Sequence, residues 1–328
     1  MHSLSAPFSG GVLGEASALP LLTLRLRIAL AFLSIYTIWG STYLAIRFAI
    51  ETLPPFLMAA IRFLIAGGVL YGWMRLRGAP RPTRANWKAT TIVGGLLLLG
   101  GNGGVTDAEL VIPSGLAAVL ITIVPIWMAL LELLRRDRIV PTAQVVLGLI
   151  LGFGGVVLLV GPGDLGGSSG LNPFWAGVLL LASLSWAIGS VYSRKASLPT
   201  LPLLGSGMEM LAGGVLLLVA SLVSREWVGF QPSNVSLLSF VSFLYLIMFG
   251  SLIAFSSYVW LLTKTTTARV STYAYVNPVV AVFLGYFLAG EQLTARTLLA
   301  SSIIVIAVVV ITTYKSKQTV SNKNGSES

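Results

Sequence analysis

Two ionisable side chains lie inside apolar stretches that are long enough to cross a membrane. Arg62 lies well inside one stretch, and Glu209 occupies the matching place in another. A charge within a bilayer costs at least about 2.5–3.5 kcal/mol, so each is a functional candidate. Arg62 could bind a substrate carboxylate through two parallel hydrogen bonds. Arg62 and Glu209 could also both face a central cavity, where a zwitterionic substrate would fit between them. Alternatively, Arg62 could form a structural ion pair with Glu209, Asp107 or Glu109.

A group of polar residues follows helical spacing in a neighbouring stretch. Asn102, Thr106 and Glu109 share one helix face, and the glycines around Asn102 suggest a close-packed or partly unwound backbone. This face could form the polar wall of a cavity, in which Asn102 contacts substrate and Glu109 carries a proton. It could equally be the solvated outer end of a helix, because Asp107 and Glu109 lie near the predicted end.

Aromatic residues at helical spacing are candidates for contact with a small molecule. Trp39, Tyr43 and Arg47 share a helix face, and Trp186 begins the same spacing in a later stretch. These rings could line a cavity and bind substrate by stacking or cation–π attraction. They could instead be packing or interfacial residues. Further candidates of this kind are Tyr258, Tyr273 and Asn277.

The elements that must position these residues follow from composition. Of the 328 residues, 55% are apolar and only 10% are charged, whereas soluble proteins average about 25% charged residues. So few charges cannot cover a soluble globule, so we expect an all-α integral membrane protein with ten transmembrane helices. The expected spans are residues 28–49, 54–74, 88–108, 113–134, 141–160, 173–193, 203–224, 237–261, 268–289 and 296–313.

The distribution of lysine and arginine predicts the orientation. Of 21 such residues, only Arg225 and Arg296 fall in one alternate set of loops, and Arg47 and Arg62 lie within or at the end of spans. All others occupy the other loops and the tails. Because cytoplasmic loops are enriched in these residues, both termini are expected in the cytoplasm. This topology also accounts for the net charge of +10 without a nucleic-acid partner.

The chain also repeats itself. The segments Trp39–Arg47, Ala66–Leu70 and Ile123–Pro125 match Trp186–Arg194, Ala212–Leu216 and Val276–Pro278. Each half holds five predicted spans, and an odd number turns the second half upside down. Such inverted-topology repeats are typical of secondary transporters, which bind substrate near the midplane between the repeats.

The repeat predicts an organisation for the whole chain. A cytoplasmic tail (1–27) precedes a first five-helix repeat (28–160), and a second repeat (173–313) precedes another cytoplasmic tail (314–328). Pro125 and Pro278 occupy paired positions in the fourth and ninth spans, where a missing backbone N–H permits bending. Both could be hinges of a conformational change or static kinks.

Short motifs in both halves resemble a known family. Trp39-Gly-Ser-Thr-Tyr43, Pro54-Pro55-Phe56 before Arg62, and the run from Pro113 to Ala117 are similar to those of an EamA domain, and Asn277-Pro278 and Gly290–Thr294 match in the second half. The resemblance covers about residues 28–314 and suggests the drug/metabolite transporter superfamily of ten-helix exporters. It implies a carrier in the cytoplasmic membrane that moves small metabolites, often amino acids or drug-like compounds, usually outward.

We therefore expect a multi-pass transporter of the inner (plasma) membrane that exports small metabolites by alternating access. Its partners would be a small-molecule substrate and the lipid bilayer, with a proton or another coupling ion as a candidate. Cysteine is absent and the single histidine, His2, lies in the tail, so we expect no enzyme activity, metal or cofactor. The alternatives are a channel or a non-transporting membrane scaffold. Nothing in the sequence sets the oligomeric state.

Overall fold

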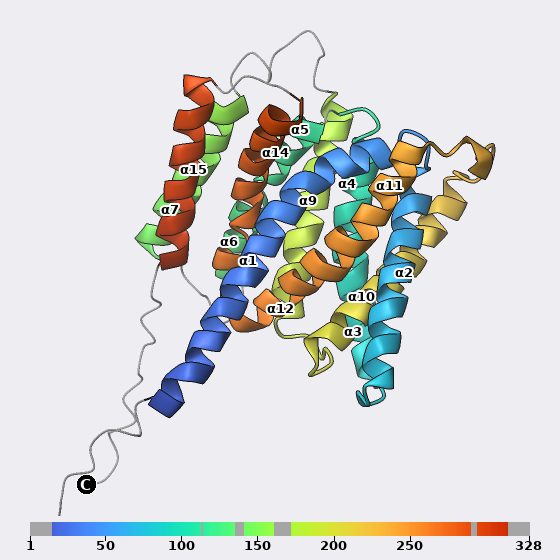
Figure 1. Cartoon of the computed structure of the whole chain (residues 1–328), viewed down its shortest axis with the longest axis horizontal. Helices are drawn as coiled ribbons and strands as arrows, with labels where there is room; N and C mark the ends of the chain where they lie inside the picture. The colour runs from blue at the N-terminus through green and yellow to red at the C-terminus, as the bar shows by residue number, and fades with distance from the viewer. Residues whose placement is uncertain (1–14, 113, 135–140, 161–171, 290–293, 314–328) are drawn as a thin grey trace, which may run out of the picture.

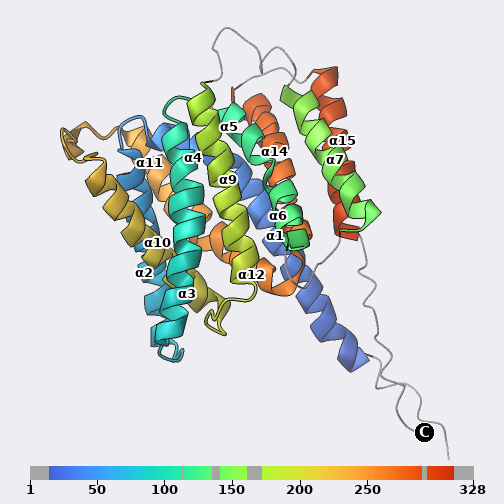
Figure 2. The same ribbon diagram turned by 180° about the vertical axis from the view of Figure 1, so that it is seen from behind.

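The computed structural model describes residues 15–112, 114–134, 141–160, 172–289 and 294–313, and over these ranges the chain is helical with no strand. Figures 1 and 2 show the helices assembled side by side in one bundle. They are α1 (Glu15–Ala49), α2 (Pro55–Leu76), α3 (Arg84–Gly94), η1 (Gly95–Gly103), α4 (Gly104–Ala108), α5 (Ser114–Ile121), α6 (Val124–Leu134), α7 (Ala143–Val160), α9 (Pro173–Ser193), α10 (Pro202–Val223), η2 (Pro232–Asn234), α11 (Leu237–Tyr245), η3 (Leu246–Phe255), α12 (Ser256–Lys264), α13 (Thr267–Val270), α14 (Tyr273–Ala289) and α15 (Ala295–Thr313).

Within the described part of the chain, seven helical runs are long and apolar enough to cross a membrane. They are Thr23–Ala49, Pro55–Leu76, Arg84–Ala108, Ala117–Leu134, Pro173–Ser193, Pro202–Val223 and Leu237–Lys264. Two shorter apolar helices cover Ala143–Leu158 and Leu298–Thr313. Large apolar side chains such as Ile150, Leu181 and Val219 are exposed on the outside of the bundle. Because such surface is stable only in lipid, the chain is an integral membrane protein.

The first helix is longer than the sequence pattern predicts. It begins at Glu15 rather than at residue 28, so the second half of the predicted tail (1–27) is helical. The leucines and arginines of this segment are good helix formers and outweigh its polar character. In Figure 1 this part of α1 runs down and away from the bundle.

Two spans contain π-helical segments at their centres. The run Arg84–Ala108 has η1 in its middle, and the run Leu237–Lys264 has η3. In η1, glycines allow a close approach to α9, since a Cβ on Gly101 would lie 2.8 Å from the ring of Trp186. Such π-helical segments commonly occur at functional sites, and both segments line the cavity described below.

Helices from the two halves of the chain pair at both edges of the bundle. Figures 1 and 2 show α7 beside α15 at one edge and α2 beside α10 toward the other. Glycines bring both pairs together, as small residues do between membrane helices. A Cβ on Gly67 of α2 would lie 2.7 Å from the backbone nitrogen of Leu211, and one on Gly155 of α7 would lie 2.8 Å from Ile304 of α15.

The two predicted hinge prolines lie in different local structures. The helix that precedes Pro125 ends at Ile121, and α6 begins at Val124, so the fourth span is interrupted just before this proline. Pro278 lies inside the continuous helix α14.

Basic residues gather at one end of the bundle. The helices α2, α9 and α12 all end at the bottom of Figure 1, where Arg77, Arg194 and Lys264 lie at or next to their last turns. We call this the basic end. Three further basic residues of the loops, Arg135, Arg136 and Arg138, lie outside the described residues. So do Pro113 and residues 290–293 of the Gly290–Thr294 motif.

Candidate functional site

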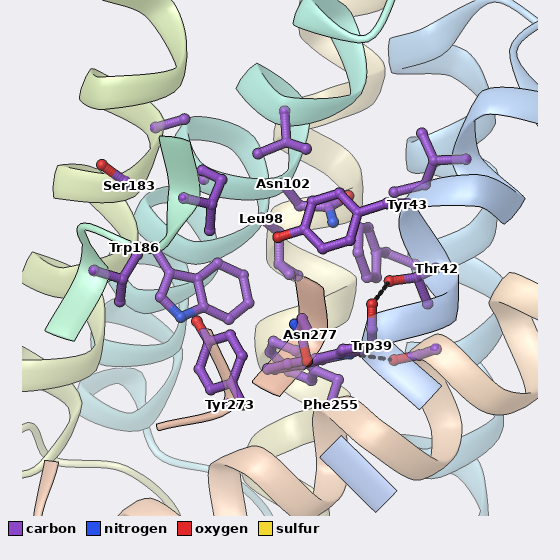
Figure 3. Close-up of a pocket in the computed structure, with 18 of the residues that line it drawn as sticks. Trp39, Thr42, Tyr43, Leu98, Asn102, Ser183, Trp186, Phe255, Tyr273 and Asn277 are labelled. Atoms are coloured by element: carbon purple, nitrogen blue, oxygen red, sulfur yellow. Dashed lines mark hydrogen bonds between the residues drawn. The ribbon is translucent and has the colours of Figure 1, made fainter. Parts of the chain in front are cut away.

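A central cavity of about 70 Å³ lies between both halves of the chain and is partly open to solvent. Mostly apolar pockets with a few well-placed polar groups are typical small-molecule sites. Figure 3 shows aromatic and amide side chains around this cavity. Its lining residues are Trp39, Thr42, Tyr43, Ile46, Arg62, Phe63, Leu98, Gly101, Asn102, Val105, Ile121, Val124, Ala182, Ser183, Trp186, Gly250, Phe255, Tyr273 and Asn277.

Arg62 is the buried cation of this cavity. It is 3% exposed, and its Nε donates to the Ser251 hydroxyl over 2.8 Å, while its Nη1 has no partner. Gly250 makes room for the guanidinium, since a Cβ there would lie 2.8 Å from Nη2. The carboxyl oxygens of Glu109 and Glu209 have no hydrogen-bond partner, so neither residue pairs with Arg62. Arg62 therefore presents an unused donor to the cavity.

Glu209 is buried but does not line the cavity. It lies on α10, and its backbone oxygen packs against Gly94 of α3, where a Cβ would otherwise lie. Both carboxyl oxygens are buried without a partner. The carboxyl is close enough to Tyr258 for an electrostatic interaction. The structure therefore separates Glu209 from Arg62, although the sequence repeat places the two residues at matching positions.

Four aromatic rings form a connected cluster, which we call the aromatic cluster. Trp39 lies 5.5 Å from Trp186, 5.1 Å from Tyr258 and 4.9 Å from Tyr273 between ring centroids. Trp186 Nε1 donates to the Tyr258 hydroxyl over 2.9 Å, and the Ser190 hydroxyl lies 2.5 Å from the same oxygen. Edge-to-face geometry and these hydrogen bonds hold the rings in one arrangement.

The aromatic cluster lies between the cavity and the basic end. On α1, which enters the bundle from the basic end (Figure 1), Trp39 comes one turn before Tyr43. Tyr258 lies in α12, close to the end of that helix at Lys264. The cluster therefore forms the floor of the cavity on the basic side.

Two amide groups line the cavity. Asn102 of η1 and Asn277 of α14 both line it, and their Oδ1 atoms are buried without a partner. The Tyr43 side chain interacts with Asn277, and Tyr43 and Asn102 both line the cavity. Two unused acceptors therefore share a cavity with one unused cationic donor.

Two arginines donate hydrogen bonds to backbone oxygens at the ends of helices. These two helix ends lie at opposite ends of the bundle. Arg47 Nη1 donates over 2.7 Å to the backbone oxygen of Glu109, and Arg194 Nη1 donates over 3.1 Å to that of Leu262 and also to that of Thr265. Each cation satisfies carbonyls at the C-terminal end of a helix, where the helix dipole favours positive charge. Glu109 itself is fully buried, so its side chain is not in the solvated setting that the sequence left open.

Most of the predicted residues meet at one place. Trp39, Tyr43, Arg62, Asn102, Trp186, Tyr273 and Asn277 line the cavity, Tyr258 lies behind them in the aromatic cluster, and Glu109 and Glu209 lie outside the lining. Sequence reasoning missed Thr42, Ser183 and Ser251. Small hydroxyl residues are common in membrane helices, so no signal distinguishes these three. Within the described ranges, no group of acidic or histidine residues could hold a metal ion.

The aromatic cluster leads to a stability prediction. Replacing Tyr258 by Phe removes the acceptor of Trp186 Nε1, while Ser190 keeps its 2.7 Å bond to the backbone oxygen of Trp186. Leaving a buried donor unpaired costs about 1–3 kcal/mol. We expect a lower unfolding temperature of the detergent-solubilised protein in a thermal-shift assay. Tyr192→Phe, at an exposed position, is the control, and an equal shift in both variants would contradict the prediction.

Comparison with known proteins identifies the family. The chain matches the EamA-like transporter family over residues 26–161 and again over 173–313. It belongs to that family. The chain is 41% identical over 283 residues to the uncharacterized inner membrane transporter YedA of Escherichia coli (strain K12), covering 86% of this chain and 89% of YedA. This EamA-family protein is accordingly a membrane transporter of the inner (plasma) membrane that crosses it several times.

More distant relatives agree on the fold. The uncharacterized transporter sll0355 of Synechocystis sp. is 27% identical, over 88% of this chain and 90% of its own. One solved crystal structure superposes with a TM-score of 0.69 at 20% identity, covering 87% of this chain and 96% of that one. At that identity the structural match establishes the fold alone, so the chemistry of this EamA-family site is argued from its own residues.

Proposed function

We propose that the protein is a secondary active transporter that exports small metabolites, such as amino acids, by alternating access around the central cavity. The observation that supports this most is the cavity itself, which has one buried cation, two free amide acceptors and aromatic walls between the two halves of the chain. The scheme includes ten spans in two inverted five-helix repeats (28–160 and 173–313) with both termini cytoplasmic. It is the expected design of a carrier that exposes one site alternately to each side.

Mirrored contacts support the inverted repeats. Arg47 contacts the backbone of Glu109 at the end of α4, and Arg194 contacts that of Leu262 near the end of α12. A two-fold axis in the membrane plane would exchange these contacts between the two ends of the bundle. The same axis would pair η1 with η3, α2 with α10, and α7 with α15, all of which occupy matching places in the fold.

The state of the carrier follows from the position of the aromatic cluster. Cytoplasmic loops are rich in Lys and Arg, so we assign the basic end to the cytoplasm. The aromatic cluster then closes the cavity on the cytoplasmic side. In this scheme the cluster parts when the cavity opens inward, and Pro125 and Pro278 act as hinges because each lacks a backbone N–H that would stiffen its helix.

The polar groups of the cavity suit a zwitterionic substrate. A carboxylate would accept from Nη1 of Arg62, which has no partner in the protein. An ammonium group would donate to the free Oδ1 atoms of Asn102 and Asn277. The rings of Trp39 and Trp186 would contact the remainder of the molecule. An amino acid carries both an anionic and a cationic group, so each of these three buried atoms would gain a partner on binding.

Glu209 is the candidate for coupling transport to protons. Its carboxyl is fully buried in a membrane span without a partner, and such groups commonly carry protons in transporters. Glu109 is similar but lies within electrostatic reach of Arg47. We expect Glu209→Gln to retain exchange of substrate between two equal pools and to lose accumulation driven by a proton gradient. Glu51→Gln, at an exposed position, should retain both, and loss of exchange in Glu209→Gln would assign Glu209 to binding instead.

Uptake into inside-out vesicles tests the proposed function. Radiolabelled amino acids and amphiphilic cations are supplied with and without a proton gradient. The proposal predicts saturable uptake of at least one carboxylated solute that depends on the gradient. Transport of cations alone would show that the zwitterion assignment is wrong, and the absence of any saturable uptake across the panel would count against a carrier of this substrate class.

A further inference from the structure

We propose that the protein carries a specific site for an anionic phospholipid at the basic end, in a groove between α1 and α15. The site lies apart from the central cavity and requires only that the chain spans a membrane. The groove has a volume of about 380 Å³. It is lined by Ile28, Phe32, Tyr36, Lys264, Thr265, Arg269, Val308 and Thr312.

The apolar walls of the groove come from two helices that face each other. Ile28, Phe32 and Tyr36 follow one another at a spacing of one turn on α1, and Val308 and Thr312 do so on α15. In Figure 1 the lower part of α1 continues below the lower end of α15. Such a wall at membrane depth is suited to an acyl chain running along the helices.

One residue fixes the inner end of this groove. The Tyr36 hydroxyl lies 2.6 Å from the hydroxyl of Thr272, which also donates to the backbone oxygen of Arg269 over 2.7 Å. The α1 wall is thereby tied to the segment that carries one of the two cations. The apolar and the charged parts of the groove are therefore held in a fixed relation.

Two cations mark the end of the groove toward the basic end. Lys264 is exposed at the last turn of α12, with its ammonium 6.0 Å from the ring centre of Trp260, and Arg269 is half-buried in α13. Thr267, in the same short helix as Arg269, donates to the buried Glu132 over 3.1 Å. Basic pockets between membrane helices bind phospholipid head groups, because Lys and Arg both hydrogen-bond phosphate.

The cations are not a requirement of the repeated fold. The contacts of Arg47 and Arg194 relate Glu109 to Leu262. The same offset relates Val111 to Lys264 and Leu116 to Arg269. Both partners in the first half are apolar. The pair of cations is therefore particular to this groove. Its place at the basic end agrees with the enrichment of Lys and Arg on the cytoplasmic side, where anionic lipid head groups are found.

Native mass spectrometry of the full-length protein in neutral detergent micelles tests the site. Dioleoyl phosphatidylglycerol is titrated against wild type, Lys264→Gln/Arg269→Gln and a control. The control, Arg81→Gln/Arg84→Gln, removes two exposed charges before and at the first residue of α3. The proposal predicts one tightly bound lipid that is weakened about tenfold in the first variant and is unchanged in the control. Equal weakening in both, or in neither, would overturn it.

A second variant tests the apolar wall without altering charge. Val308→Trp fills the groove from α15 and should also weaken the lipid about tenfold while the protein keeps its elution profile. Dioleoyl phosphatidylcholine should bind more weakly than phosphatidylglycerol by a similar factor. Displacement of the lipid by inorganic phosphate at equal concentration, or normal binding in Val308→Trp, would show that the groove is not a lipid site.

Discussion

Replacing Arg62 by Ala should lower the transport of a carboxylated solute about 100-fold. The guanidinium is buried in the cavity beside the Phe63 ring, its Nε donates to Ser251, and its Nη1 has no partner. A charge pair formed in such a desolvated site contributes about 2–5 kcal/mol when it is truncated, so its loss affects binding strongly. Initial rates of radiolabelled uptake into vesicles, normalised to the amount of protein, measure the effect.

Two further variants make the Arg62 result specific. Arg62→Lys keeps the charge but loses the planar fork, so it should recover only part of the activity. Arg81→Ala removes an exposed arginine and should transport normally. Uptake of the same carboxylated solute that persists in Arg62→Ala would show that Arg62 does not bind substrate, and its role would then be confined to the contact with Ser251.

A single methyl group at Gly67 should destabilise the bundle by about 1–3 kcal/mol. A Cβ there would lie 2.7 Å from the backbone nitrogen of Leu211 and 2.8 Å from the backbone oxygen of Gly207. Both are main-chain atoms of α10, so the clash can be relieved only by separating two helices. For Gly67→Ala we expect an unfolding temperature about 5–10 °C lower in detergent, by the usual scaling of free energy to temperature.

The adjacent glycine provides a matched control. Gly68 is on the same helix but exposed, and a Cβ there would meet no atom within 4 Å. Gly68→Ala should therefore keep the unfolding temperature of the wild type, because alanine is the better helix former. Similar losses of stability in the two variants would mean that α2 and α10 do not pack through Gly67 as described.

The features readable from the sequence were those carried by strong local patterns. Apolar runs and breakers indicated helices close to the observed ones, and the spacing of Trp39 and Tyr43, which begins again at Trp186, made these residues candidates for a cavity lining. Arg62 could be found because a charge within an apolar run is costly. These signals depend on the composition and the helical periodicity of the sequence. Both can be read without knowing how the helices are assembled.

The remaining features depend on assembly. The repeat suggested that Arg62 and Glu209 could face one cavity, yet only Arg62 lines it. A rotation of a helix by a fraction of a turn is enough to move a side chain from the cavity to a contact between helices. The role of Ser251 depends on a contact between α2 and η3. The π-helical geometry of η1 and η3 likewise follows from packing against neighbouring helices, for which the glycines near Asn102 gave only a partial indication.

Counterflow in proteoliposomes tests the proposal of a carrier with one alternating site most directly. Purified protein is reconstituted, the vesicles are loaded with an unlabelled amino acid, and a trace of the same labelled compound is added outside. The account predicts a transient accumulation of label above its equilibrium level, with a rate that saturates with concentration and is lost in Arg62→Ala. A flux that rises linearly with concentration and shows no transient accumulation would contradict it and indicate a channel.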